Sequence, residues 1–102
     1  MNPFGVSDKN INMIVEVCKK HTIEKIVIYG SRARGDYSRT SDIDIAIYAD
    51  NLSSKDMNLL RYEISELDII YKMDIVHVKT LEKHGLIEAI EKEGKVIFAS
   101  NV

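Results

Sequence analysis

The segment from Asp42 to Tyr48 alternates between two kinds of side chain at every position. One set of positions holds only isoleucine and the other begins with two aspartates; the sets are Ile43, Ile45 and Ile47, and Asp42, Asp44, Ala46 and Tyr48. Because successive side chains of a β-strand point to opposite faces, this pattern predicts a strand with an apolar inner face and two carboxylates on its outer face. The sheet that contains it should carry its helices mainly on the inner face, which leaves the outer face for the carboxylates.

Hydrophobic spacing and turn residues around this strand predict the remaining elements. Their expected order is helix, strand, short helical turn, strand, helix, strand, helix and strand. The corresponding ranges are 7–18, 22–29, 31–35, 42–48, 53–67, 71–78, 80–93 and 95–99. We therefore expect residues 1–102 to form a single α/β (α+β) domain, with a small mixed β-sheet and helices packed mainly on one face.

The overall composition argues against several classes of function. A formal net charge of −2 argues against direct nucleic-acid binding through bulk electrostatics. The single Cys18 cannot form an internal disulfide, which favours a reducing compartment. The sequence has no signal-peptide pattern and no apolar run approaching the roughly 20 residues that span a bilayer. We expect a cytoplasmic protein that does not bind a membrane.

A turn of small and basic residues separates the first strand from the aspartates. Residues 30–35 read Gly-Ser-Arg-Ala-Arg-Gly and follow the apolar run Ile-Val-Ile-Tyr. Free backbone N–H groups in such a turn bind phosphate, and two carboxylates on one side of a strand bind a hard divalent cation. This combination is suited to moving a phosphate-bearing group.

A third carboxylate strengthens this interpretation. Asp74 lies within the apolar run from Met73 to Val78, where an unpaired charge would be costly to bury. If its strand neighbours the strand of Asp42 and Asp44, three carboxylates converge, and two Mg²⁺ ions about 3.5–4 Å apart could bind there. Asp68 is a weaker candidate, because it follows a helical stripe and is expected in a loop.

Taken together, these motifs resemble the nucleotidyltransferase superfamily of the DNA polymerase beta type. The string Gly-Ser-Arg-Ala-Arg-Gly-Asp, followed by Ser-Asp-Ile-Asp-Ile-Ala-Ile and a distant Asp74, looks like the minimal nucleotidyltransferase (MNT) branch. That branch includes the MntA-type antitoxins, which are encoded beside HEPN-domain toxins. The resemblance covers residues 23–98 and implies the nucleotidyltransferase fold.

The resemblance also implies roles for individual residues. Gly30 and Ser31 would hold the β- and γ-phosphates of ATP, the expected nucleotide triphosphate substrate. Asp42 and Asp44 would bind the two Mg²⁺ ions, and Asp74 would complete the metal shell and help to activate the acceptor hydroxyl. These three aspartates are the predicted catalytic and metal-binding residues.

Several neighbouring side chains are open to two interpretations. Arg32 and Arg34 either bind phosphate or form solvated contacts, such as an ion pair with Asp36. Tyr37 and Tyr48 either stack on a base or pack against the sheet. Among the histidines and the cysteine, we expect His77 and Cys18 to be packed, and His21 and His84 to lie at the surface.

Three functions fit these features. The first is a Mg²⁺-dependent enzyme that moves AMP from ATP to a hydroxyl; by resemblance, the acceptor is a tyrosine of a HEPN-type toxin, held in a hetero-oligomer. The second is a non-catalytic antitoxin that masks its HEPN partner by contact. The third, a transferase for small molecules such as aminoglycosides, is weaker, because the sequence leaves no residues for an acceptor pocket. Three acids on one face favour the enzyme.

Overall fold

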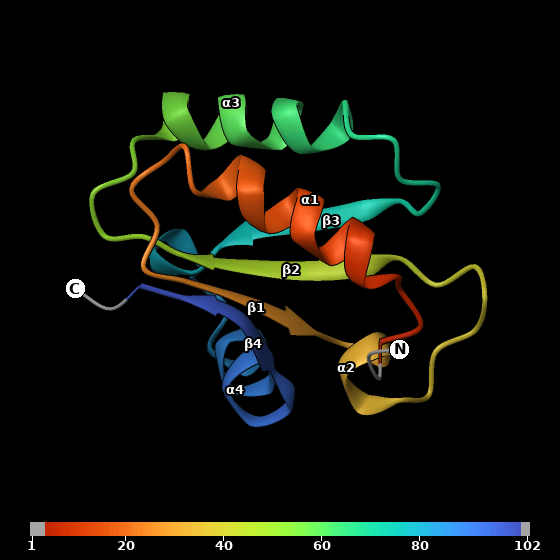
Figure 1. The fold of residues 1–102 in the computed structure, drawn as a ribbon. Coiled ribbons are helices and arrows are strands. Elements are labelled where there is room, and N and C mark those ends of the chain that lie inside the picture. Colours follow the sequence, from red (N-terminus) through yellow and green to blue (C-terminus); the bar gives the residue numbers. More distant parts are fainter. Residues whose placement is uncertain (1–3, 101–102) are drawn as a thin grey trace.

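The computed structural model describes residues 4–100, so the single-domain prediction for residues 1–102 extends beyond them at both ends. Its core is a four-stranded sheet in the order β3-β2-β1-β4. The elements are α1 (Asp8–Cys18), β1 (Lys25–Tyr29), α2 (Ser31–Arg34), β2 (Ile43–Tyr48), α3 (Ser54–Ser65), β3 (Met73–His77), the 3₁₀ helix η1 (Val78–Thr80), α4 (His84–Glu93) and β4 (Lys95–Ala99). Figure 1 shows the sheet with helices above and below it. The predicted order of elements is confirmed.

The sheet is mixed, as predicted. β1 is antiparallel to both β2 and β4, whereas β2 and β3 are parallel. The parallel pair is connected through α3, which crosses over one face of the sheet (Figure 1). Parallel strands need such a crossover, whereas antiparallel neighbours do not.

One face of the sheet packs against α1 and α3. The isoleucines of β2 are fully buried there, together with apolar residues of both helices; this cluster includes Ile43, Ile45, Ile47, Ile14, Cys18, Met57, Leu60 and Ile64. Figure 1 shows α1 and α3 on the same side of the sheet. The alternation of residues 42–48 therefore has the predicted orientation, and Cys18 is a core residue as expected. Burial raises the pKa of its thiol to about 12.

The opposite face, which we call the open face, is covered only in part. Ile90 of α4 packs there against Val27, Tyr29 and Ala46. Gly94 ends α4 as predicted, but its φ of −63° shows that no left-handed turn requires glycine. A Cβ at Gly94 would instead overlap the Ile90 carbonyl and the Val27 side chain, so close packing of α4 on β1 explains the residue.

Local capping agrees with the sequence at two helices. The Ser7 and Ser53 hydroxyls accept hydrogen bonds from the backbone N–H groups of Asn10 and Asp56, each at 3.1 Å. Such caps satisfy amides that have no partner inside the helix. The predicted strand 71–78 is shorter in the structure, because the chain turns into η1 after His77.

The histidines divide between confirmed and wrong predictions. His77 is packed, with its Nε2 atom 2.7 Å from the Ala49 carbonyl, and His84 is exposed. His21 was expected at the surface, but its side chain is only 10% exposed and lies 2.6 Å from Glu63 of α3. The pairing could not be read from the sequence, since the partners are 42 positions apart.

Within residues 4–100, the structure has no helix with the length and apolar character of a membrane span.

Candidate active site

Two neighbouring strands bring the predicted carboxylates together. Asp44 on β2 lies opposite Asp74 on the parallel strand β3 and opposite Tyr29 on β1. Residues in register on adjacent strands point to the same face of a sheet. Asp44 and Asp74 therefore share the open face, and Asp42 lies two positions before Asp44 at the start of the strand. Asp42 and Asp74 are exposed, whereas Asp44 is half-buried.

The electrostatics of the site show that these groups influence one another. Burial raises the pKa of Asp44 above its ordinary value of 3.8, and the negative charges of Asp74 and Asp42 raise it further, while Arg34 lowers it. Burial and the charges of Asp44 and Asp74 also raise the pKa of Tyr29 to about 12. The site therefore concentrates negative charge, which is an environment that attracts divalent cations.

The turn before α2 has the geometry that its glycine suggested. Gly30 has a φ of +76°, a conformation that side chains with a Cβ rarely adopt. A Cβ at this position would also overlap the carboxylate oxygen Oδ2 of Asp44. The glycine thus brings the start of α2 directly against the carboxylate site. The N–H groups of the first turn of α2, beginning with Ser31, have no acceptor within the helix and are the predicted phosphate donors.

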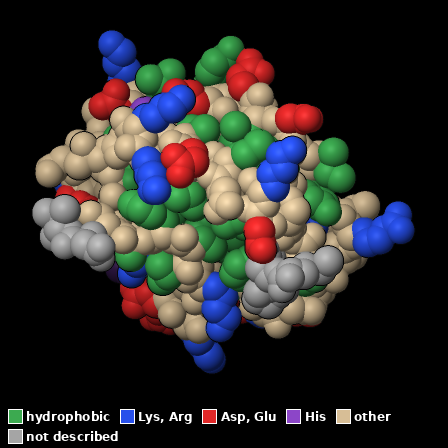
Figure 2. All heavy atoms as spheres, in the orientation of Figure 1, with side chains coloured by type: hydrophobic (Ala, Val, Ile, Leu, Met, Phe, Trp, Pro, Cys, Tyr) green, Lys and Arg blue, Asp and Glu red, His purple; other side chains and the backbone are tan. Residues whose placement is uncertain are grey.

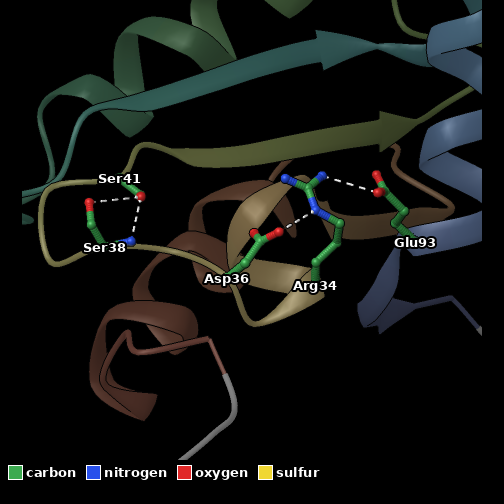
Figure 3. Close-up of polar contacts among 5 residues, drawn as sticks. All are labelled: Arg34, Asp36, Ser38, Ser41 and Glu93. Atoms are coloured by element: carbon green, nitrogen blue, oxygen red, sulfur yellow. Dashed lines mark hydrogen bonds and ion pairs between the residues drawn. The ribbon is translucent and has the colours of Figure 1, made fainter.

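Arg34 is held at the edge of the site by two carboxylates. Its Nε donates to Asp36 at 3.1 Å, and its Nη1 donates to Glu93 at the end of α4 at 3.0 Å. Figure 3 shows the Arg34 guanidinium between these two acids. The ion pair with Asp36 is the alternative that the sequence left open, and both carboxylates raise the pKa of Arg34.

Arg32 is placed differently from the sequence interpretation. The residue is 1% exposed, and within residues 4–100 its guanidinium donates to the backbone carbonyls of Phe4 and Ser41. A buried guanidinium whose N–H groups already donate to carbonyls is not available to a phosphate in this conformation, so this geometry does not support the prediction of Arg32 as a phosphate ligand. The reason is the packing of two tyrosine rings around it, which the sequence did not show.

The donor set suits a hard cation, although the side chains are not gathered around one. All three candidate ligands are carboxylates, the oxygen donors that Mg²⁺ prefers. Over residues 4–100, no three histidine, cysteine, aspartate or glutamate side chains are arranged closely enough to hold a metal ion. Asp42 and Asp74 are exposed, and exposed side chains can change rotamer. Asp68 lies in the loop after α3, as expected.

Sequence reasoning missed two participants in this region. Tyr29 was treated only as the end of a strand, yet its ring is buried at the carboxylate site with Asp44 directly across the ladder. Glu93 is the second: its side chain is 23% exposed and forms an ion pair with Arg34. The strand parity of Tyr29 relative to Asp44 was a usable signal for the first; none was available for the second.

The remaining alternatives concern tyrosines near the sheet. Tyr37 packs against the Arg32 guanidinium, and Lys25 Nζ lies 4.2 Å from the centre of the Tyr48 ring. These contacts favour packing for both rings. A groove of about 710 Å³ lies along α1, and the carboxylates of the candidate site are not among its lining residues. On the face shown in Figure 2, acidic and basic side chains are interspersed, with apolar side chains between them.

Comparisons with known proteins show what the chain as a whole is similar to. Two proteins of Methanocaldococcus jannaschii, each named "putative protein adenylyltransferase", are similar to the chain. One is 36% identical over 55 residues, covering 53% of this chain and 59% of the relative. The other is 32% identical over 80 residues, covering 78% of this chain and 63% of the relative. The chain thus spans about 60% of the length of these relatives.

A solved structure and a family model extend the similarity to most of the chain. A crystal structure of a toxin-antitoxin with AMP-PNP contains a chain with a TM-score of 0.71 and 26% identity; the match covers 90% of this chain and 75% of that one. The family model described as "Polymerase beta, Nucleotidyltransferase" matches residues 12–102. That range contains the turn at Gly30 and Ser31, which we call the phosphate turn for its predicted role, and all three candidate carboxylates. The chain therefore belongs to the polymerase beta nucleotidyltransferase family.

Proposed function

We propose that this chain is a Mg²⁺-dependent nucleotidyltransferase that transfers AMP from ATP to a tyrosine hydroxyl of a HEPN-type toxin and thereby acts as its antitoxin. One observation supports this most strongly. Asp44 and Asp74 share the open face in register, Asp42 adjoins them, and the Gly30 turn lies directly against Asp44. The proposed phosphate donors and the proposed metal ligands are therefore neighbours, an arrangement that supports transfer of a phosphate-bearing group.

Each residue has a distinct role in this proposal. The backbone N–H groups at the start of α2 and the Ser31 hydroxyl bind the terminal phosphates. Asp42, Asp44 and Asp74 would hold the Mg²⁺ ions, which when bound neutralise phosphate charge and activate oxygen nucleophiles. Asp74 is exposed and can face an incoming acceptor. Arg34, released from Asp36 and Glu93, reaches the same side of the turn and would add positive charge.

The reaction that these residues serve is a single substitution at phosphorus. The acceptor oxygen loses its proton and forms a bond to the α-phosphorus of ATP. The bond from that phosphorus to the oxygen bridging to the β-phosphate breaks, and pyrophosphate leaves. The donors at Gly30 and Ser31 stabilise the charge on the departing pyrophosphate, while Asp74 is placed to help remove the acceptor proton.

A protein acceptor is supported by the relatives and by the shape of the chain. Both Methanocaldococcus relatives carry the name protein adenylyltransferase, and the AMP-PNP structure is of a toxin-antitoxin. Among residues 4–100, Asp42 and Asp74 are exposed on the sheet rather than enclosed in a pocket. An acceptor brought in by another protein, in a hetero-oligomer, fits an open carboxylate face of this kind.

The test is to incubate the chain with Mg²⁺, ATP and a HEPN-domain protein from the neighbouring reading frame. We expect mass spectrometry to show AMP added to a tyrosine of the partner, and label from the α-phosphate but not the γ-phosphate to be retained. Asp74→Asn should abolish transfer while much of the ATP binding remains, because its role lies mainly with the acceptor.

A contact-only antitoxin is the outcome that would displace this proposal. In that case the partner stays unmodified yet is neutralised on mixing, and Asp42→Asn neutralises it equally well. Label from the γ-phosphate on the partner would contradict the proposed bond cleavage.

A further inference from the structure

Arg32 is a fully buried cation in the short helix that carries the phosphate turn. The residue is 1% exposed, and the three hydrogen bonds that its side chain forms within residues 4–100 all go to main-chain oxygens. Nε and Nη2 donate to the Ser41 carbonyl at 3.1 and 2.9 Å, and Nη1 donates to the Phe4 carbonyl at 2.8 Å. Arg32 thus joins three segments that are separate in the sequence.

Two aromatic rings enclose the same guanidinium. Its Cζ atom lies 4.4 Å from the centre of the Tyr71 ring and 4.9 Å from that of Tyr37. No carboxylate among residues 4–100 forms an ion pair with Arg32. Burying a charge without a counter-ion is costly, and here three charge-assisted hydrogen bonds and two cation–π contacts offset that cost. Such an arrangement depends on the planar fork of arginine, which lysine lacks.

The position of the Ser41 carbonyl affects Asp42, because Asp42 is the next residue in the chain. The α2–β2 loop (residues 35–42) closes on itself near this point: the Ser38 N–H donates to Ser41 Oγ at 2.9 Å, and the Ser41 N–H donates to the Ser38 carbonyl at 3.2 Å. Figure 3 shows Ser38 and Ser41 facing one another in this loop. On the other side of Asp42, the Ile43 N–H donates to the Lys72 carbonyl at 2.9 Å.

The geometry points to Arg32 as a positioning residue that fixes Asp42 relative to the phosphate turn. Arg32 is adjacent to Ser31 on α2, and its guanidinium holds the carbonyl adjacent to Asp42. One side chain therefore sets the spacing between the proposed phosphate donor and the proposed metal ligand. Its guanidinium donates to the Ser41 and Phe4 carbonyls and not to the Asp42 carboxylate. This inference rests on the proposed function for the role of Asp42. The hydrogen bonds of Arg32 to the Ser41 and Phe4 carbonyls, which we call the Arg32 clamp, are present in the protein without a ligand.

The experiment compares Arg32→Lys with wild type by amide hydrogen exchange in the absence of nucleotide. The amides of Ser38, Ser41 and Ile43 are the reporters, because each donates a hydrogen bond within or beside the loop. We expect their exchange to accelerate tenfold or more, while the slowest amides of α1 and α3 keep their rates. Local opening of this kind is distinguishable from global unfolding by its confinement to one segment.

Arg61→Lys is the matched control. Arg61 also donates its Nε to a backbone carbonyl, that of Ile75 at 3.3 Å, but it is exposed on α3. Its substitution should leave exchange in the α2–β2 loop unchanged. If Arg32→Lys does not fold, Tyr37→Leu replaces it, with Tyr37→Phe as its control. Removing the ring over the guanidinium should accelerate loop exchange a few-fold, and keeping the ring should not.

A second measurement separates the clamp from the proposed function. Calorimetry with ATP and Mg²⁺ should show affinity about tenfold lower for Arg32→Lys than for wild type. If wild type binds no ATP, the proposed function fails, while the exchange data still decide the clamp. Unchanged loop exchange in Arg32→Lys, or equal acceleration throughout the protein, would overturn the inference.

Discussion

At the scale of single residues, the site depends on close contacts that only certain side chains permit. Gly30 combines a positive φ with direct proximity to Asp44, and Asp44 is held beside two further carboxylates. The clustering of like charges around Asp44 costs stability. Such local costs commonly mark functional sites.

Gly30→Ala should weaken both the fold and nucleotide binding. The alanine Cβ would occupy a strained φ and displace the Asp44 carboxylate, so we expect a loss of about 1–3 kcal/mol in unfolding free energy and clearly weaker Mg²⁺-ATP binding. Gly85→Ala is the matched control, because a Cβ there meets no atom within 4 Å and the φ is not positive. Denaturant unfolding and calorimetry decide; equal behaviour of the two variants would refute the close approach at Gly30.

Asp44→Asn should stabilise the protein at neutral pH when divalent cations are removed by a chelator. Because folding raises the pKa of Asp44, the folded state holds this proton more tightly than the unfolded chain, and stability falls as the pH rises from the ordinary value of 3.8 through the raised value. The cost is fully present above the raised pKa and absent well below 3.8.

The measurement is therefore a series of thermal melts against pH. The Tm of Asp44→Asn should exceed that of wild type at pH 7 and converge with it in acid. A large destabilisation by Asp44→Asn at pH 7 would show that the carboxylate has a structural role instead. Exposed Asp68, changed to asparagine, serves as the control and should show no such pH-dependent difference.

At the scale of elements, the sheet is asymmetric: α1 and α3 cover one face, and α4 covers only part of the other. α4 is attached mainly through Ile90, which is 1% exposed, and through the close packing of Gly94 on Val27. This leaves the strand ends with Asp44 and Asp74 free for a ligand. α4 also carries Glu93, so its position affects Arg34.

Ile90→Ala should loosen α4 from the open face. Removing this buried side chain leaves a cavity against β1 and β2, for which we expect a loss of about 2–5 kcal/mol in unfolding free energy. Ile70→Ala is the control, because Ile70 is 88% exposed and should cost less than about 0.5 kcal/mol. Denaturant titrations measure both; similar small losses would mean that Ile90 is not what anchors α4.

At the scale of the whole molecule, local patterns predicted most of the fold. The isoleucine alternation gave the inner face of β2, serine caps gave two helix starts, and the order of elements followed from turn residues. The sequence predicted that Asp44 and Asp74 converge only if their strands are neighbours. It could not establish that pairing, because long-range packing determines which strands pair. Recognition of the sequence motif pointed to the same three carboxylates.

The remaining errors have a common physical cause. Arginine is mostly a surface residue, so nothing local predicted that Arg32 would be buried against a carbonyl 28 positions away. The contacts of His21 with Glu63 and of Arg34 with Glu93 are likewise non-local, at separations of 42 and 59 positions. Sequence patterns report which face a side chain occupies more reliably than which partner it finds there.

If the turn at Gly30 and Ser31 and the three carboxylates form one Mg²⁺-ATP site, ATP binding depends on both Mg²⁺ and the carboxylates, and calorimetry measures this dependence. ATP is titrated into wild type with Mg²⁺ and with chelator, and into the double variant Asp42→Asn, Asp44→Asn with Mg²⁺. We predict binding to wild type that requires Mg²⁺, and at least tenfold weaker binding to a folded double variant. Equal ATP affinity in all three titrations would show that the turn and the carboxylates do not form one Mg²⁺-ATP site.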